Sequence, residues 1–121
     1  MNLYRMISAA HLEHYYKRPR IPRGLIKSMR KGIVVGSACE AGELFRAMVR
    51  GEDEATLLKI AAFYDYLEIQ PIGNNAFMIR NGTAKNEEEL RNYNRRIVEL
   101  GRKLNKMVVA TGDVHFLERC V

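Results

Sequence analysis

Three things are scarce in this sequence: cysteines, long apolar runs and, in the first quarter of the chain, acidic residues. Cys39 and Cys120 are its only cysteines and lie far apart, which excludes the dense, even spacing of a secreted disulfide framework. No apolar run approaches the roughly 20 residues that a membrane span requires, and residues 1–10 lack the features of a secretory signal peptide. We therefore expect two free thiols and a cytoplasmic protein with no membrane partner.

The scarcity of acids makes the first quarter of the chain strongly basic. Residues 1–31 hold one acid against eight Lys and Arg, a local net charge of +7, whereas the whole chain carries +6. Such a patch fits contact with the phosphate backbone of DNA, but it also fits a solvated face or the seam with an acidic neighbour. Tyr15 and Tyr16 either stack on a base or complete a core. The candidate nucleic-acid contacts are Lys17, Arg18, Arg20 and Arg23.

What is present fits one folded domain. Apolar residues make up 47% of the chain and charged residues 28%, which is close to the globular average and far from the composition of disordered segments. The length of 121 residues also matches one domain rather than two. We expect residues 1–121 to form a single domain around a hydrophobic core.

In the first part of the chain the apolar pattern predicts helices and one strand. Helical spacing favours an amphipathic helix over residues 2–16. Pro19 and Pro22 exclude its continuation and favour an extended connector, after which a short helix is expected over residues 23–30. The β-branched run 33–35 lies between two glycines and predicts a buried parallel strand.

The rest of the chain alternates helices and strands. Its clearest helix begins after Asn86, which can cap it, and carries three glutamates in the first turn and apolar side chains along one side. Strands that alternate with helices indicate an α/β fold with a parallel sheet, closed as a barrel or left open, whose chemistry collects at the carboxyl ends of the strands. The predicted elements are helices 41–50 and 53–64, a strand 66–72, a small strand or hairpin arm 77–79, a helix 86–104 and a buried strand 107–110.

Polar residues follow two of the predicted strands. Asp113 and His115 share one face if the segment is extended, because strand side chains repeat every second residue. A carboxylate and an imidazole suit zinc or manganese, and a bound metal makes water a nucleophile near neutral pH. Cys39 lies just beyond another predicted strand, so its thiolate is a third candidate ligand. A hydrogen-bonded Asp–His pair without a metal explains the same pattern.

Each of these polar residues also has an interpretation without metal chemistry. Cys39 stands among Ala and Gly, where a small buried apolar side chain is the common role. A nucleophilic Cys39 with His115 as its base is a further alternative. Glu40 and Glu43 lie in the first turn of a predicted helix, whose N-terminus stabilises carboxylates that have no catalytic role.

Several blocks of sequence stand in one order along almost the whole chain. Taken together they are similar in order and spacing to the PHP domain of the PolC-type DNA polymerase III alpha subunit, and their combination is far more specific than any one block. The blocks are Asn2-Leu3-Tyr4, His11-Leu12-Glu13, Arg18-Pro19-Arg20-Ile21-Pro22, Gly36-Ser37-Ala38-Cys39-Glu40, Asp65-Tyr66-Leu67-Glu68-Ile69 and Val108-Val109-Ala110-Thr111-Gly112-Asp113-Val114-His115.

The resemblance implies a partial TIM-like barrel of the distorted PHP type, with parallel strands alternating with helices. It also implies a site of several divalent metal ions, zinc or manganese, whose family ligands map here onto Cys39, Asp113 and His115. The other ligands of the family belong to sequence upstream of Met1, so the site in this chain is expected to be incomplete. We therefore expect the C-terminal portion of a PHP domain, a fragment of a larger polymerase.

The same resemblance implies a function for the parent rather than for the fragment. The parent would synthesise DNA in replication, and its PHP domain would be structural or a metal-dependent phosphoesterase, whereas this chain alone is expected to be inactive. Its implied partners are the remainder of the polymerase chain, DNA and, through exposed strand edges, further copies of itself. Two rivals remain: a small stand-alone metal-dependent phosphoesterase, and a non-enzymatic module that binds nucleic acid or a replication partner.

Overall fold

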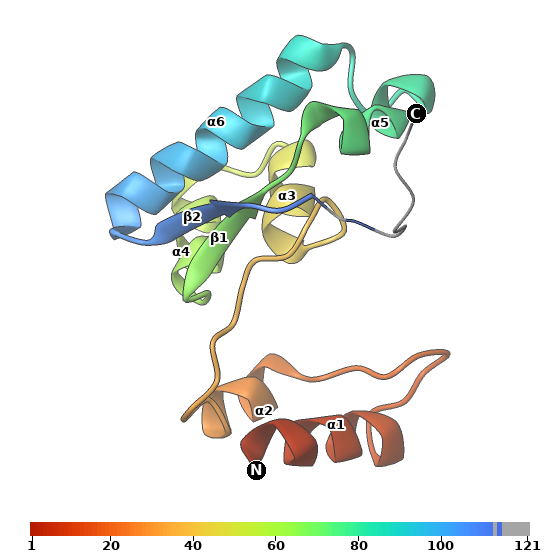
Figure 1. Ribbon diagram of the computed structural model, residues 1–121, viewed down its shortest axis with the longest axis vertical. Helices are drawn as coiled ribbons and strands as arrows, with labels where there is room; N and C mark the ends of the chain where they lie inside the picture. Colours follow the sequence, from red (N-terminus) through yellow and green to blue (C-terminus); the bar gives the residue numbers. More distant parts are fainter. Residues whose placement is uncertain (113, 115–121) are drawn as a thin grey trace. The chain divides into compact units, whose positions relative to one another are not determined.

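The computed structural model describes residues 1–112 and Val114 and contains both helices and strands (Figure 1). Its residues divide into two compact units, Met1–Val34 and Val35–Val121. The expected α/β class is confirmed at this level, because two strands pair in parallel within a mainly helical chain. The expectation of a single domain stays a prediction.

The first unit consists of two helices joined by an extended connector. α1 (Asn2–Leu12) buries Met6 and Ala10, which lie one turn apart on the same face. The predicted continuation of this helix to residue 16 is wrong. Tyr16 and Arg18 form an isolated bridge across Lys17, whose φ of 60° is left-handed, so the chain turns here. The predicted short helix is confirmed as α2 (Arg23–Ser28).

The second unit is built on a two-stranded parallel sheet. β1 (Tyr66–Ile69) pairs with β2 (Met107–Ala110) in a register that places Tyr66 opposite Met107 and Ile69 opposite Ala110. A parallel pair requires a long crossover connection, and the helix α6 (Glu87–Leu104) lies in it. The other elements of this unit are α3 (Glu43–Val49), α4 (Glu54–Ala62), the 3-10 helix η1 (Ile72–Asn75) and α5 (Phe77–Arg80).

The core of the second unit joins α3, α4 and α6 to the sheet. The Phe45 ring meets the Tyr93 ring edge-on, with centroids 5.3 Å apart. A Cβ on Gly101 would overlap the Val108 side chain, so glycine at this position lets α6 approach β2 closely. The largest fully buried side chains are Leu44, Leu57, Leu67 and Ile97.

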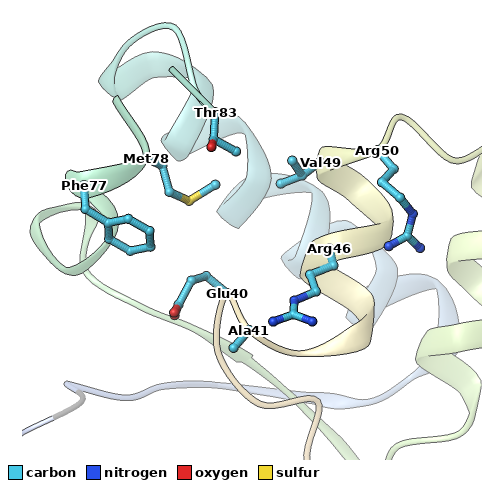
Figure 2. Close-up of a pocket in the computed structure, with 8 residues that line it drawn as sticks. All are labelled: Glu40, Ala41, Arg46, Val49, Arg50, Phe77, Met78 and Thr83. Atoms are coloured by element: carbon cyan, nitrogen blue, oxygen red, sulfur yellow. The ribbon is translucent and has the colours of Figure 1, made fainter. Parts of the chain in front are cut away.

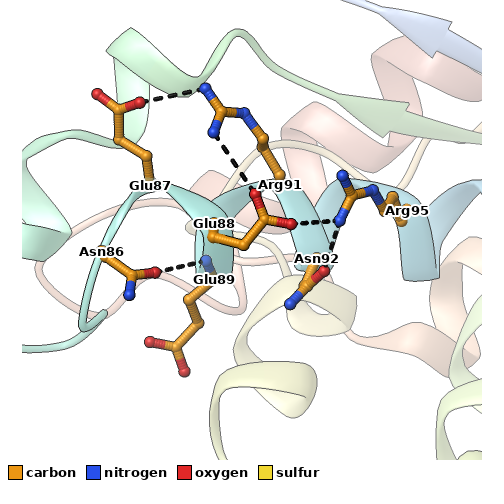
Figure 3. A network of polar contacts seen from close by, with 7 residues as sticks. All are labelled: Asn86, Glu87, Glu88, Glu89, Arg91, Asn92 and Arg95. Atoms are coloured by element: carbon orange, nitrogen blue, oxygen red, sulfur yellow. Dashed lines mark hydrogen bonds and ion pairs between the residues drawn. The ribbon is translucent and has the colours of Figure 1, made fainter.

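The helix predicted over residues 86–104 is confirmed as α6, with Asn86 as its N-cap. The Asn86 side chain accepts a hydrogen bond from the Glu89 backbone N–H at 3.0 Å (Figure 3). Arg91 lies 3.2 Å from Glu87, which is one turn earlier, and such pairs add a few tenths of a kcal/mol each, about 0.2–0.5. The predicted apolar side comprises Leu90, Tyr93, Ile97, Leu100 and Leu104; the first four are buried and Leu104 is partly buried.

Two strand predictions are wrong. Residues 33–35 form no strand, and Val34 is 73% exposed; only Gly36 makes a parallel bridge, to Tyr66. The chain leaves the sheet because Ala38 takes a left-handed φ of 60° and the Ser37 hydroxyl, rather than a backbone carbonyl, accepts the Glu68 N–H at 2.9 Å. Residues 77–79 are helical, which reflects the ambiguity of short apolar runs.

Other boundaries differ more modestly from the predictions. The predicted strand 66–72 ends at Ile69, because Pro71 has no N–H to continue a ladder and η1 follows it. β2 is confirmed as a strand but is not buried along its length, since Met107 is 71% exposed. The break predicted at Gly51 is confirmed, where φ is 76°.

Candidate functional site

The candidate site lies at the carboxyl ends of β1 and β2. The Thr111 N–H donates to the Ile69 carbonyl at 3.0 Å, so the chain continues beside β1 past the end of β2. Asn74 donates its side-chain N–H to the Gly112 carbonyl at 2.9 Å, which fixes the backbone immediately before residue 113. Polar side chains from four separate segments gather around this edge of the sheet.

A strained loop carries Cys39 to the same edge. Ala38 takes a left-handed φ, which is uncommon for alanine and costs roughly 1–2 kcal/mol. The Gly42 N–H then donates to the Cys39 carbonyl at 2.9 Å and closes the turn. A Cβ on Gly42 would overlap the Ser37 carbonyl oxygen, so the tight return of this loop requires glycine.

Cys39 is a free, half-buried thiol. Burial is the largest influence on its pKa and raises it above the ordinary value; the Ala41 backbone opposes this shift and Glu40 adds to it. A raised pKa keeps the thiol protonated near neutral pH, which opposes the alternative of an activated nucleophile. The thiol therefore fits a buried side chain, or a ligand that loses its proton only when a metal binds.

Glu68 is the charged residue that sequence analysis overlooked. It lies in β1, lines one recess together with Cys39, and its Oε2 accepts a hydrogen bond from the Thr111 hydroxyl at 3.2 Å. The sequence could have indicated Glu68, because it is the one carboxylate inside the strand Tyr66–Ile69 and lies on the face opposite to the buried Leu67.

Three amides complete the recess and were also overlooked. Asn94 donates to the Gln70 backbone carbonyl at 2.9 Å from the middle of α6. The residues Gln70 and Asn75 are 7% and 3% exposed, and their side-chain Oε1 and Oδ1 atoms have no hydrogen-bond donor among the described residues. An unpaired buried acceptor costs about 1–3 kcal/mol, and the recess has no free space for a water-sized group beside these oxygens.

The structure does not test the predicted set of metal ligands. Cys39 lines a recess with residues at the end of β1, although the strand 33–35 from which its position was predicted does not form, and Asp113 and His115 lie outside the described residues. Within residues 1–112 and Val114, no group of three His, Cys, Asp or Glu side chains is arranged to hold a metal ion. The convergence of Cys39, Asp113 and His115 stays a prediction.

The predicted nucleic-acid contacts lie in the first unit. Tyr16 is exposed, with the Arg20 guanidinium 5.0 Å and the Lys17 ammonium 5.8 Å from its ring centroid. Tyr15 is also exposed, so the interpretation that these two tyrosines complete a core is wrong. Arg18 and Arg23 are exposed as well, and Arg23 opens α2.

Among the described residues, no helix is both long and apolar enough to cross a membrane.

Comparison with known proteins gives matches over almost the whole chain to proteins named DNA polymerase III PolC-type, although no family model matches the chain. The chain is 54% identical over 117 residues to the DNA polymerase III PolC-type of Clostridium perfringens (strain 13 / Type A), a match covering 97% of this chain and 8% of that protein. It is 56% identical over 110 residues to the DNA polymerase III PolC-type of Caldanaerobacter subterraneus subsp. tengcongensis, covering 91% of the chain and 8% of that protein. The corresponding protein of Bacillus subtilis (strain 168) is 41% identical over 116 residues, covering 96% of the chain and 8% of that protein. The chain thus spans about 8% of the length of these relatives.

Proposed function

We propose, from its homology to one segment of proteins named DNA polymerase III PolC-type, that this chain is part of a polymerase that synthesises DNA in replication. The observation that carries the proposal is a 54% identity that covers 97% of the chain but only 8% of the relative. The remainder of the polymerase chain is then its main partner. A cytoplasmic location belongs to the same proposal.

The DNA that flanks the reading frame tests this proposal. We expect the upstream sequence to encode further metal ligands and the downstream sequence to encode the body of a polymerase. Flanking genes unrelated to a polymerase, together with a stable, active protein from this frame alone, would support a stand-alone enzyme instead.

Within the polymerase, we propose that the segment is the C-terminal portion of a PHP-type domain with a partial TIM-like barrel. The β1–α6–β2 unit supports this, because a parallel pair joined through a helix is the repeating element of such barrels. The chain at residues 35–37 supplies a further extended segment beside β1, where the Ser37 N–H donates to the Tyr66 carbonyl at 3.2 Å.

We further propose that Cys39, Asp113 and His115 hold a divalent metal ion, zinc or manganese, within a larger ligand set. Such an ion, when bound, would lower the pKa of a water molecule and so supply a nucleophile for phosphoester cleavage. Two observations support the proposal: the left-handed turn at Ala38 lies directly before Cys39, and the Asn74 side chain donates to the Gly112 carbonyl, next to residue 113. Glu68, fixed by Thr111, and the unpaired oxygens of Gln70 and Asn75 add acceptor groups beside them.

Cobalt substitution tests this ligand set directly. Because the site is expected to be incomplete, we expect weak Co²⁺ or Zn²⁺ binding in calorimetry and a thiolate-to-cobalt absorption band at high metal concentration. Cys39→Ser should abolish the band, Asp113→Ala should weaken binding further, and Cys120→Ser is the matched control that should leave both unchanged.

Two results would contradict this prediction. A thiolate band that survives in Cys39→Ser would remove Cys39 from the ligand set. Tight, stoichiometric binding by the isolated chain, with phosphodiesterase activity that is lost in Asp113→Ala, would favour the stand-alone phosphoesterase.

A second candidate function is binding of single-stranded DNA through the basic segment. The observation in its favour is the exposed Tyr16 ring flanked by Lys17 and Arg20, because aromatic faces stack on bases while cations hold phosphates. Among the described residues, Lys17, Arg18 and Arg20 have no salt bridge.

Fluorescence anisotropy with an oligothymidylate, measured over a series of salt concentrations, tests this function. Arg20→Gln should weaken binding and reduce the salt slope by about 0.7, the value for one lost phosphate contact on a single strand. Tyr16→Ala should weaken binding by about 1–3 kcal/mol for a stacked base. Arg102→Gln, which makes the same charge change on an exposed site of α6, should have little effect. If Arg20→Gln and Arg102→Gln weaken DNA binding equally, the binding depends on the net charge of the chain and not on the basic segment.

A further inference from the structure

A second concave site lies in the second unit, next to the polar recess at Cys39, with which it shares the residue Glu40. It is a pocket of about 460 Å³ between α3, α5 and the loop that precedes α3 (Figure 2). This volume falls within the range of roughly 300–1,000 Å³ that is typical of small-molecule sites. Neither the metal proposal nor the DNA proposal uses this pocket.

One wall of the pocket is apolar. Phe77 and Met78 extend from α5 into the cavity, and Val49 of α3 closes it on another side (Figure 2). Met78 is buried, whereas the Phe77 side chain is 39% exposed and partly forms the mouth. A large aromatic ring beside a thioether offers a surface for a flat apolar group.

The opposite wall is cationic. Arg46 lies on α3, and Arg50 caps the C-terminal end of this helix one turn later; in Figure 2 the Arg46 side chain turns towards Glu40 and Ala41, whereas the Arg50 guanidinium points away from Phe77 and Met78. The Arg50 Nε lies 3.4 Å from Glu52, so this guanidinium already has an anionic partner. Arg46 has no salt bridge among the described residues, and its planar guanidinium matches the two oxygens of a carboxylate.

Glu40 limits the charge that the pocket accepts. Its side chain lines the same cavity, near Arg46 in Figure 2. The Glu40 carboxylate repels a ligand with two negative charges more strongly than a ligand with one, so a single charge held on Arg46 is the least opposed. The pocket therefore combines a flat apolar surface, one available guanidinium and a barrier to polyanions.

We propose that this pocket binds a small aromatic monocarboxylic acid. The ring of the ligand packs against Phe77, Met78 and Val49, and its carboxylate forms a bidentate pair with Arg46. Glu40 makes the site select a singly charged acid over a phosphate monoester. The inference rests on the pocket alone and does not depend on the proposed function.

Titration of the full isotope-labelled chain with 2-naphthoate, followed by amide NMR spectra, tests the proposal. We expect saturable shifts of the amides in α3, α5 and residues 40–42. The neutral isostere 2-naphthamide should bind at least about tenfold more weakly, because it lacks the charge-assisted pair with Arg46. Adenosine monophosphate, a more highly charged probe, should also bind more weakly than 2-naphthoate.

Three variants complete the experiment. Arg46→Gln should weaken 2-naphthoate binding at least about tenfold, whereas Arg102→Gln, with the same change in net charge, should leave it unchanged. Glu40→Gln should decrease the ratio of the dissociation constant for adenosine monophosphate to that for 2-naphthoate. Circular dichroism of each variant confirms that it is folded, and Arg46 and Arg102 are both exposed.

The inference is wrong if 2-naphthoate shows no saturable binding or shifts only amides outside the pocket. It is also wrong if 2-naphthoate and 2-naphthamide bind equally, or if the Arg46→Gln variant binds 2-naphthoate as tightly as the original chain. Tighter binding of adenosine monophosphate than of 2-naphthoate would contradict the role assigned to Glu40. The pocket would then be a site for phosphate esters rather than for a carboxylic acid.

Discussion

At the scale of single residues, the position of Cys39 depends on neighbours that carry no chemistry of their own. Ala38 supplies a left-handed turn, and the adjacent Ser37 hydroxyl accepts the Glu68 N–H and so ends the approach to the sheet. Gly42 lies so close to the Ser37 carbonyl oxygen that no side chain fits between them. The loop is thus specified by sterics and by one side-chain hydrogen bond rather than by a regular element.

The substitution Gly42→Ala tests this account. The added Cβ collides with backbone rather than with a flexible side chain, so we expect a loss of stability of about 1–3 kcal/mol in urea denaturation, by analogy with overpacked sites. The reaction of Cys39 with a thiol reagent, measured in a Cys120→Ser background, should change in rate because the loop has to move.

Gly24→Ala is the matched control for this prediction. A Cβ at Gly24, which lies in α2, meets no atom within 4 Å, and alanine favours a helix over glycine by about 1 kcal/mol. This variant should be neutral or slightly stabilising and should leave the reactivity of Cys39 unchanged. A Gly42→Ala variant as stable as Gly24→Ala would contradict the steric account of the loop.

At the scale of elements, the helices differ in how their first turns are satisfied. α4 begins after Asp53, whose carboxylate accepts the Thr56 N–H at 2.8 Å, whereas α6 begins after the neutral Asn86. The hydrogen bonds from Thr56 lower the pKa of Asp53, while no proton can be added to the Asn86 amide in this range. The Asp53 side-chain cap of α4 is therefore sensitive to pH, whereas the Asn86 side-chain cap of α6 is not.

The variant Asp53→Asn isolates this pH dependence. The folded-state pKa of Asp53 is depressed, so its contribution to stability is complete above the unfolded pKa of about 3.9 and is lost as pH falls through the lower folded value. We expect the original chain to lose stability relative to Asp53→Asn on acidification through this window, since asparagine still caps the helix. Urea unfolding of both proteins between neutral and acidic pH measures the difference.

Carboxylates common to both proteins cancel in this comparison. Glu54 and Glu88 also have lowered pKa values, mainly through Lys103 and Arg95, but both residues are present in each variant. A stability difference that stays constant with pH would show that the Asp53 carboxylate contributes nothing to the cap beyond what the amide does.

At the scale of the whole molecule, the sheet ends at an open strand. β1 has residues 35–37 on one side and β2 on the other, and among the described residues no strand pairs with the outer edge of β2. Met107 is 71% exposed at the start of this edge. Unpaired N–H and C=O groups beside exposed apolar side chains form a template for pairing with another strand.

We therefore expect the isolated chain to self-associate through the edge of β2. Light scattering over a concentration series should report species larger than a monomer, and Met107→Lys should reduce them, because lysine on an edge opposes strand pairing. Val34→Lys is the control, since Val34 is similarly exposed but lies outside any strand. A monomer at high concentration in the original chain would contradict this prediction, and equal effects of both variants would assign the association to general hydrophobicity.

The sequence by itself determined the elements that local interactions specify. α6 was predicted with its cap because Asn86, the first-turn glutamates and the apolar repeat all lie within the helix that they stabilise. Both strands of the sheet and the break at Gly51 were predicted for the same reason. The α/β class followed from the alternation of helices and strands.

Only the tertiary structure decided how distant segments meet. The run 33–35 has the composition of a strand, but the Ser37 hydroxyl and the turn at Ala38 draw the chain off the sheet after a single bridge. Glu68 and Asn94 lie far from Cys39 in sequence and line the same recess, and Arg46 and Phe77, also distant in sequence, line the second pocket. Composition and periodicity report the interactions of near neighbours, whereas both sites are made by contacts between residues that are remote along the chain.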